Sequence, residues 1–358
     1  MKSTFLSFLL LISCYNIKAQ TSVSQFNPGI TSNGVTYALP RTALSFECSA
    51  MRIHYKPGRF AAYANRYLNL QNVEQAERTD YQLTNIQMRS IGVVDTTKLY
   101  TVKYKSKTTA PMVNLGEGGI ILSINKTDVA TSSASFNSAT TTTSRSNNRV
   151  DPSQYLTPEI LSATSTAKMA ELTAAEIYDI RESRNAIMRG QVESMPKDGE
   201  SLRIMLTELE RHETALMSLF IGEADTTDIS YVKVYEPTTE VQHKVLFRFS
   251  KKLGFTDDDD LAGEPYYISI ADRHTVSIPT PEQLAKRKIT GIVYNLPGMA
   301  NVEISTVNRQ LLKQDVPLAQ FGTTDQLPAN LFNKETRTSV EFHPATGAIR
   351  QLQNTNNE

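Results

Sequence analysis

The sequence predicts an α+β protein that is mostly β, and three observations predict this class. Short segments with alternating hydrophobic and polar residues, separated by Gly, Pro, Asn and Asp, fill residues 20–126 and 223–358, and this pattern is typical of antiparallel strands. Two long segments with helical periodicity lie between them and are joined by a short turn, which indicates a helical hairpin. We therefore expect a β-rich N-terminal unit, a central antiparallel helical hairpin and a C-terminal antiparallel β-sandwich-like domain.

The length and composition suit a globular protein of about two domains. The chain has 358 residues, of which 40% are hydrophobic and 21% are charged, so it can bury a core and is not expected to be globally disordered. Lys plus Arg and Asp plus Glu both number 37, which gives a formal net charge of zero. A neutral chain without a basic cluster lacks the charge that phosphate contacts require, so we expect no nucleic-acid partner.

The first residues have the three parts of a secretory signal peptide. Lys2 supplies a positive charge, Phe5–Ile12 is a short apolar run, and Ala19 ends a cleavage site before Gln20. These features predict export, with residues 1–19 removed by cleavage between Ala19 and Gln20. The expected location is the periplasm, the outer membrane or the cell surface.

A second interpretation of this region is a lipoprotein signal. The residues "LISC" resemble a lipobox, and Cys14 would then carry a lipid that holds the protein on a membrane. Cleavage after Ala19 is favoured, because the apolar run before Cys14 is short. No later segment reaches the roughly 20 apolar residues of a membrane-spanning helix, so we expect no transmembrane segment, and a lipid anchor only if Cys14 is modified.

Residues 20–126 are expected to form strands and one short helix. A first strand segment places Leu44, Phe46, Cys48 and Ala50 on one face. The segment "RFAAYANRYLNL" has helical spacing, and strand patterns follow in "DYQLTNIQMRSIGVV", "KLYTVKYKS" and "GGIILSIN". Once Cys14 has left with the signal peptide, Cys48 has no partner for an intramolecular disulfide, and we expect it to be a small buried residue.

Residues 127–150 separate this unit from the helices. They are rich in Ser, Thr and Asn and contain almost no large apolar side chains. Such a stretch cannot bury enough surface to offset the entropy lost on ordering. We interpret it as a flexible linker or long loop, and a glycosylated stalk is the alternative.

Residues 151–222 are expected to hold the helical hairpin. The first helix has one apolar face and ends before Gly190, which suits a helix C-terminus. The second helix repeats its seam residues at steps of three and four, the spacing of a heptad. The expected inward positions are Met169, Leu172, Ile177, Ile180 and Ile187 in the first helix, and Leu202, Met205, Leu209, His212, Leu216 and Leu219 in the second. Packing of the hairpin against itself and a sheet is favoured over a partner-binding arm, and His212 is expected to be a core residue.

Residues 223–358 return to strand patterns. The segments are "TDISYVKVYEP", "EVQHKVLFRFSKKLG", "EPYYISIAD", "KITGIVYNLP", "ANVEISTVNRQ", "DVPLAQFG", "TRTSVEFHP" and "GAIRQLQ". Near-regular spacing of many short strands predicts a sandwich or barrel. The last two segments indicate a hairpin with Pro344 and Gly347 at its tip.

Signature motifs of catalysis are not found in the sequence. The chain has no H-E-x-x-H, no G-x-S-x-G, no phosphate-binding glycine loop before a helix, and its five histidines show no metal-ligand spacing. We therefore predict no catalytic residue, no cofactor-binding residue and no cofactor, and a non-enzymatic protein is favoured.

Four consecutive carboxylates, Asp257, Asp258, Asp259 and Asp260, are the only candidate metal ligands. A calcium loop of the EF-hand type needs Gly at its sixth position, and Ala262 stands there. Adjacent side chains in an extended backbone point to opposite faces. We expect a solvated turn between two strands rather than a metal site.

Two short stretches, Asp95 to Thr97 and Asp225 to Thr227, have the sequence Asp-Thr-Thr. They resemble the acceptor motif of the O-glycosylation known in Bacteroidota. If the motif is used, Thr96 and Thr226 would carry glycans.

Several longer blocks occur together in an order that resembles one family. They are "GVTYALPRTALSFE", "YKPGRFAAYANRYL", "STAKMAELTAAEIYDIRESR", "MPKDGESLRIMLTELERHETALMSLFIG", "DLAGEPYYIS" and "VPLAQFG". As a set they resemble an uncharacterised family of exported Bacteroidota proteins, domain of unknown function 4831. The resemblance extends from about Gly34 to the C-terminus. It implies a bacterial origin and export, and it implies no activity.

These observations lead to two expected functions. The first is a binding or structural component of the cell envelope, whose partner is a protein or a surface glycan. The alternative is a periplasmic or surface hydrolase that acts on a glycan or a peptide. A His–carboxylate pair in a deep cleft would favour the hydrolase, and an exposed apolar face on the hairpin would favour binding or assembly.

Overall fold

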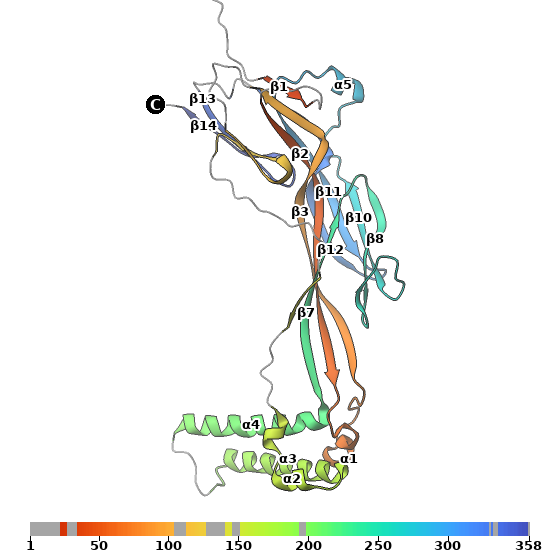
Figure 1. Ribbon diagram of the computed structural model, residues 1–358, viewed down its shortest axis with the longest axis vertical. Helices are drawn as coiled ribbons and strands as arrows, with labels where there is room; N and C mark the ends of the chain where they lie inside the picture. The colour runs from red at the N-terminus through yellow and green to blue at the C-terminus, as the bar shows by residue number, and fades with distance from the viewer. Residues whose placement is uncertain are drawn as a thin grey trace, which may run out of the picture.

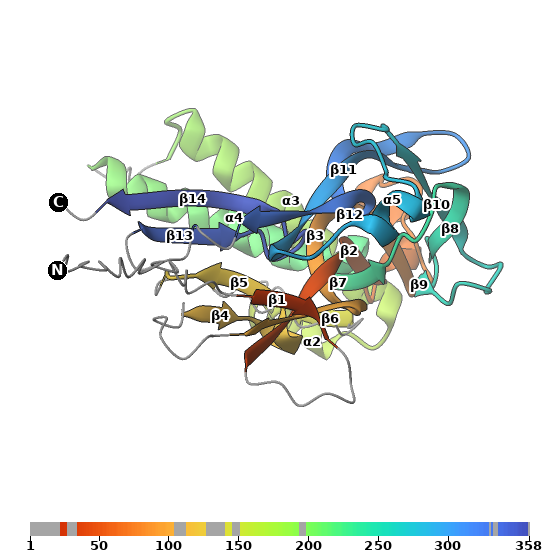
Figure 2. The ribbon, with the colours of Figure 1, turned by 90° about the horizontal axis from the view of Figure 1, so that it is seen from above.

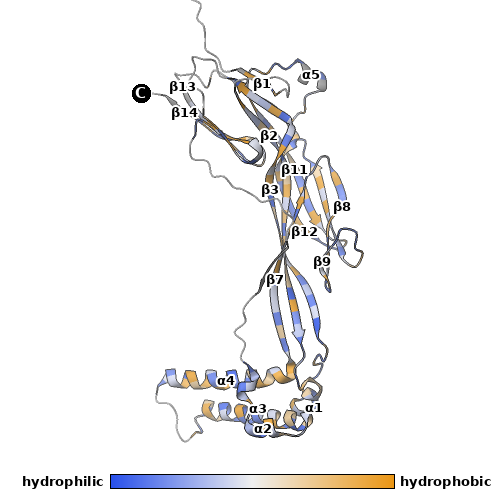
Figure 3. Cartoon of the chain, in the orientation of Figure 1, coloured by the Kyte–Doolittle hydropathy of each residue, from blue (hydrophilic) through white to orange (hydrophobic). Residues whose placement is uncertain are grey.

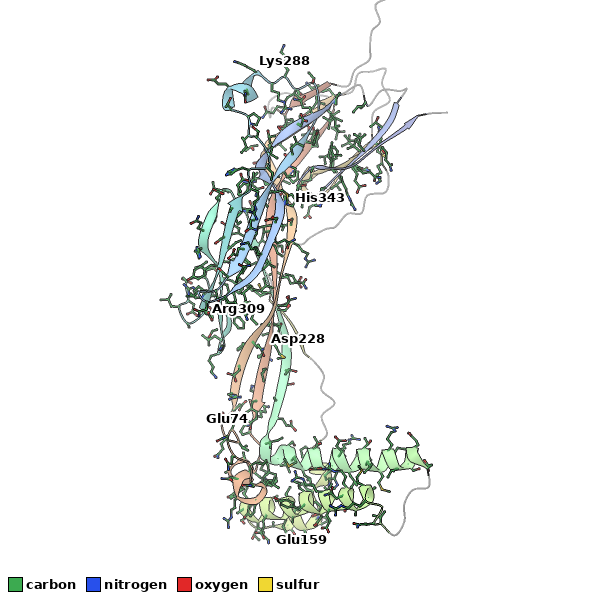
Figure 4. All side chains as sticks on the ribbon, turned by 180° about the vertical axis from the view of Figure 1, so that it is seen from behind. Glu74, Glu159, Asp228, Lys288, Arg309 and His343 are labelled. Atoms are coloured by element: carbon green, nitrogen blue, oxygen red, sulfur yellow. The ribbon has the colours of Figure 1, made fainter. Side chains whose placement is uncertain are left out.

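A computed structural model describes residues 22–26, 34–103, 112–126, 140–144, 151–192, 198–328, 331 and 336–356. The molecule is elongated, with a body of strands at one end and helices at the other (Figure 1). We call the helical end the foot, and the strands that connect it to the body the neck. Figure 4 marks the neck with Asp228 and the foot with Glu159. The predicted class, α+β and mostly β with a helical hairpin, is confirmed.

The first sheet has the strand order β1-β3-β2-β7-β6. Two long strands, β2 (Gly34–Lys56) and β3 (Arg78–Lys103), run from the body through the neck. β7 (Glu223–Tyr235) pairs with β2 from Leu44 onward, and β1 (Ser22–Gln25) and β6 (Thr140–Ser144) form the edges. Segments that are far apart in the sequence therefore share this sheet.

The second sheet has the order β12-β11-β10-β8-β9. Its strands are β8 (Val241–Ser250), β9 (Gly254–Thr256), β10 (Glu264–Asp272), β11 (Gly291–Ser305) and β12 (Gln310–Pro328). All neighbours are antiparallel. A short helix, α5 (Pro281–Lys286), lies between β10 and β11.

The second sheet packs on the first, so the sandwich forms between N-terminal and C-terminal segments. The predicted face of β2 is fully buried in this core. Its buried members are Leu44, Phe46, Cys48, Ala50, Leu246, Phe247, Phe249, Tyr266, Ile268, Ile270, Ala300, Val302, Ile304, Val316, Leu318 and Phe321. Hydrophobic and hydrophilic residues alternate along these strands (Figure 3), as expected for strands with one buried face.

The third sheet has the order β14-β13-β5-β4. It consists of β4 (Val113–Leu115), β5 (Ile121–Ile124), β13 (Thr336–Phe342) and β14 (Ile349–Asn356), with a 3₁₀-helix η2 (Glu117–Gly119) between β4 and β5. Seen from above, it extends from the first sheet on the side away from β8 and β10 (Figure 2). The predicted hairpin of the last two strands is confirmed.

A second buried cluster joins the three sheets at the upper end of the body. It consists of Val23, Tyr37, Leu39, Tyr100, Val102, Ile121, Ile124, Ile292, Val293, Leu327, Val340 and Phe342. The hydroxyl of Tyr37 accepts from the backbone N–H of Val293 (2.9 Å) and donates to its carbonyl (3.1 Å). This buried exchange ties β2 to β11 and leaves neither group without a partner.

The foot contains the remaining elements: η1 (Ala61–Tyr63), α1 (Ala64–Leu68), η3 (Pro152–Tyr155), α2 (Pro158–Ser162), α3 (Thr166–Met188) and α4 (Gly199–Ile221). Asp198 caps α4, because its carboxylate accepts from the N–H of Ser201 (2.7 Å). The predicted stop at Gly190 is confirmed, since that residue follows α3 with φ of 69°.

Some expectations fall on residues outside this description. Ala19, Gln20 and Cys14 lie there, as do most of the residues of the expected linker. Within that linker, however, residues Thr140–Ser144 form the edge strand β6 and pair with β7. Backbone pairing with β7 provides hydrogen bonds to five residues whose composition alone suggested a loop. In the described part of the chain, no helix has the length and apolar character needed to cross a bilayer.

Candidate functional site

The inner half of the helical hairpin is firmly held to the rest of the foot. The rings of Phe60 and Phe220 lie 5.4 Å apart, and the N–H of Phe60 donates to the carbonyl of Leu219 (2.7 Å). The ring of His212 packs on Tyr155 of η3 at 4.6 Å. These contacts fix the end of α4 that joins β7.

The outer half of the hairpin extends beyond the covering segments (Figure 1). Three large apolar side chains are exposed there: Met188 of α3 at 71%, and Ile204 and Met205 of α4 at 52% and 39%. Nearby, a hollow of about 330 Å³ on α3 is lined by Asp179, Glu182, Ser183, Ala186, Ile187 and Val192. We call the surface formed by Met188, Ile204 and Met205 the foot tip.

An ionic clamp holds the two helices at the middle of the hairpin. The carboxylate of Glu213 accepts from Nε of Arg181 (2.6 Å) and from Nη1 of Arg184 (2.7 Å). Because Glu213 is mostly buried and both arginines are half-buried, these bonds are less screened by solvent than a surface pair. The clamp keeps α3 and α4 antiparallel where the apolar packing ends.

The predicted inward positions agree with the structure better in α3 than in α4. Met169, Ile177, Ile180, Ile187 and Leu216 are buried, whereas Met205 is exposed. Leu206, the residue after Met205, is half-buried. The inward face of this turn therefore includes Leu206, and the heptad spacing that placed Met205 there was wrong by one residue.

The four aspartates form a turn between β9 and β10. A carboxylate oxygen of Asp258 pairs with Nζ of Lys233 (2.6 Å), and one of Asp260 accepts from the N–H of Ala262 (2.9 Å). These two side chains therefore have separate partners. Among the residues that the structure covers, no group of three or more His, Cys, Asp or Glu side chains is placed to hold a metal ion.

The two candidate glycosylation residues lie in different surroundings. Thr96 is exposed in a bulge of β3, where Asp95 is buried and accepts from the N–H (3.0 Å) and the hydroxyl (2.6 Å) of Thr97. Thr226 is half-buried on β7, opposite Ile53 of β2 in the neck. Of these two residues, only Thr96 is therefore exposed.

Cys48 is fully buried in the body, as expected. Burial, with a smaller effect of Glu47, raises the pKa of its thiol to about 12. The thiol is therefore protonated and inert at neutral pH.

A His–carboxylate pair on the neck was not found from the sequence. Nε2 of His54 lies 2.9 Å from Oε1 of Glu77, and Nδ1 of His54 lies 3.0 Å from the hydroxyl of Thr79. A neutral His54 donates to Glu77 and accepts from Thr79, which is the order of a nucleophile, base and orienting acid. Glu77 is 59% exposed, so water competes for its carboxylate. This contact forms because strand pairing places residue 54 opposite residue 79, and no local sequence motif predicts it.

Comparison with known proteins gives one family. The model of a family described as a domain of unknown function, DUF4831, matches residues 33–350. No curated protein and no solved structure matches the chain. The match spans every described strand and helix except β1 and all but the first two residues of β14.

Proposed function

The chain belongs to the DUF4831 family, and we propose that it is an exported cell-envelope protein of Bacteroidota with a binding or structural role. Its partner in this proposal is a protein or a glycan of the envelope. The observation that carries the proposal is the foot tip, where Met188, Ile204 and Met205 are exposed on a hairpin that the neck holds away from the body. Exposed apolar side chains on a projecting part of a protein can form an interaction surface.

The foot is built to present this surface in a fixed position. The Glu213 clamp at the middle of the hairpin and the packing of His212 on Tyr155 hold the two helices in place. A rigid hairpin loses little conformational freedom on binding, which favours affinity. We propose that the neck acts as a spacer between the body and this contact surface.

The test is co-purification from a native outer-membrane extract with two variants. The double substitution Ile204→Asp with Met205→Asp places charge on the foot tip and should reduce recovery of a partner by about tenfold or more. Leu261→Asp, at an 83% exposed residue of the body, is the matched control and should change nothing. Equal recovery with both variants would exclude the foot tip as the contact.

The hydrolase remains the second candidate, and the His54 arrangement is the observation that favours it. In the hydrolase hypothesis, Thr79 is the nucleophile, His54 is the base that activates it, and Glu77 is the acid that orients His54. The protein should then hydrolyse at least one member of a panel of envelope glycans and peptides. His54→Ala should abolish this hydrolysis, and Glu77→Gln should lower its rate. Turnover that survives His54→Ala would remove this arrangement from consideration.

A further inference from the structure

In the part of the chain that the structure describes, one edge of the first sheet is left open along β3. β1 pairs with β3 from Tyr100 to Lys103, and the N–H of Phe26 donates to the carbonyl of Leu99 (2.9 Å). At the other end of this edge, the carbonyl of Lys251 accepts from the N–H of Tyr81 (2.8 Å). Between these two points, residues 85–91 of β3 pair with β2 alone among the described residues. An open edge is a row of backbone donors and acceptors that an added strand can satisfy.

The side chains at this edge are also incompletely covered. Ile86 and Met88 face the body core and pack against it, yet both are only half-buried. Their partners across the ladder on β2, Cys48 and Phe46, are fully buried. One more strand next to β3 would cover both apolar side chains, as the adjacent strand does for β2.

The residues along the open edge have a chemically symmetric order. The sequence from Thr84 to Ser90 is "TNIQMRS", and Gln87 lies at its centre. If two copies pair antiparallel with Gln87 opposite Gln87, Ile86 lies opposite Met88 and Asn85 opposite Arg89. Apolar side chains then meet apolar ones on the core face, and polar side chains meet on the outer face.

We propose that a second copy of this chain pairs with β3 in this register, so that the first sheets of two molecules join across a two-fold axis at Gln87. A two-fold contact of this kind closes on itself and yields a dimer. The regular pairing covers residues 85–89, because a bulge at Thr84 shifts the ladder between Asn85 and Leu83.

The charges at the edge permit this contact. Arg89 is the only charged residue from Thr84 to Ser90, and it forms an ion pair with Glu47 of the neighbouring strand. The register places the two copies of Arg89 opposite Asn85 and not opposite each other. The stretch has no proline and no lysine, the residues that commonly block strand addition at an edge.

Cysteine cross-linking tests the register in the full-length mature protein. Gln87→Cys brings two thiols opposite each other at the axis, within the distance that a disulfide spans, and should give a covalent dimer on mild oxidation. Asn85→Cys is the matched control on the same exposed face, and its partner in the dimer is Arg89, so it should stay monomeric on denaturing gels. Cys48 does not interfere, because it is buried and its pKa is raised to about 12.

Analytical ultracentrifugation tests the association itself. Gln87→Asp places two carboxylates opposite each other and should weaken the dimer by about fivefold, whereas Asn85→Asp faces Arg89 and should not weaken it. A wild-type protein that stays monomeric at high concentration would overturn the proposal, and so would a dimer that Gln87→Cys fails to cross-link. Binding of an extended peptide of another protein by a monomeric chain would equally overturn it and assign the edge to a different occupant.

Discussion

Gly347 shows how one residue decides the fit of a whole hairpin. It lies in the left-handed region with φ of 72°, and a Cβ there would lie 2.8 Å from Cδ of Pro40 and 3.0 Å from Nδ2 of Asn295. The amide of Asn295 donates to the carbonyls of Pro40 (2.9 Å) and Thr346 (2.8 Å). The hydroxyl of Thr42 donates to the carbonyl of Ala345 (2.9 Å). The tip of the β13–β14 hairpin is therefore buried between the first and second sheets.

Substitution of Gly347 by Ala should destabilise the body more than a glycine substitution in open space. Any L-residue in the left-handed region costs about 1–2 kcal/mol, and the contacts with Pro40 and Asn295 should add about 1–3 kcal/mol of overpacking. Gly119→Ala is the control, because that glycine has φ of 82° and nothing within 4 Å of its Cβ position. Urea unfolding measures both. Equal losses would contradict the crowding argument.

The sequence predicted the tip residues Pro344 and Gly347 but not their burial. Turn propensity is local, whereas the groups that enclose the tip, Thr42 and Asn295, come from distant strands. The His54–Glu77 pair was missed for the same reason, because its members meet only through strand register. Cys48 was predicted correctly, since alternation alone places it on the core face.

At the scale of elements, the Glu213 clamp makes the hairpin a single unit. Glu213→Ala should lower the stability of the foot by about 1–2 kcal/mol, because two half-buried guanidinium groups lose their acceptor. The control is Glu208→Ala, whose 3.9 Å pair with Arg211 is exposed and should contribute about 0–0.5 kcal/mol. Thermal melting followed by the helical circular-dichroism signal compares them. Equal melting temperatures for the two variants would refute a special role for the clamp.

A second ionic cluster ties β13 to its neighbours and gives stability a pH dependence. Glu341 is bonded by Lys126 and by Nη1 of Arg350 (2.9 Å), and chiefly the Lys126 bond lowers the pKa of its carboxyl from the ordinary 4.5. A lowered folded pKa stabilises the protein above pH 4.5, and the contribution is lost as the pH falls through the folded value. The difference in unfolding free energy between wild type and Glu341→Gln should therefore shrink below that pH. A difference that grows on acidification would contradict this sign.

Strand boundaries were the least predictable part of the elements. Pro297 and Gly298 suggested a break between two strands, but β11 continues through them with a shift of register between Leu296 and Gly298. A bulge lets a strand carry a proline without losing its neighbour. Likewise, Asp95 to Lys98 bulge out of a single long β3 that was expected as two segments. Residues that disfavour a strand, such as proline and glycine, predict a local irregularity. Only the neighbouring strand shows whether regular pairing continues beyond it.

At the scale of the molecule, the body and the foot have separate cores. The foot core holds Phe60, Ala64, Leu68, Ile160, Met169, Ala170, Ala174, Ile177, Ile180, Leu216 and Phe220, and none of these belongs to the body clusters. Between them, residues 51–56 of β2 include no fully buried side chain. The two ends therefore share backbone hydrogen bonds through the neck but little apolar packing.

This separation predicts two unfolding units. Leu216→Ala should reduce hydrogen-exchange protection of α3 and α4 by an amount equivalent to about 2–5 kcal/mol and leave β11 unchanged. Val302→Ala should do the reverse, with loss in β11 and none in α4. Hydrogen exchange read by mass spectrometry resolves the two regions. Loss of protection at both ends in either variant would show that the neck couples them.

The buried tip of the β13–β14 hairpin also sets the order in which the body can be completed. These are the last two strands in the sequence, yet their tip fills the space between Thr42 of β2 and Asn295 of β11. During synthesis, β2 emerges more than two hundred residues earlier. Until the hairpin arrives, the long strands lack their closing contact and expose apolar surface. The body is therefore completed only after its last strands are made, and its folding should be slow because this closing contact joins residues far apart in the sequence.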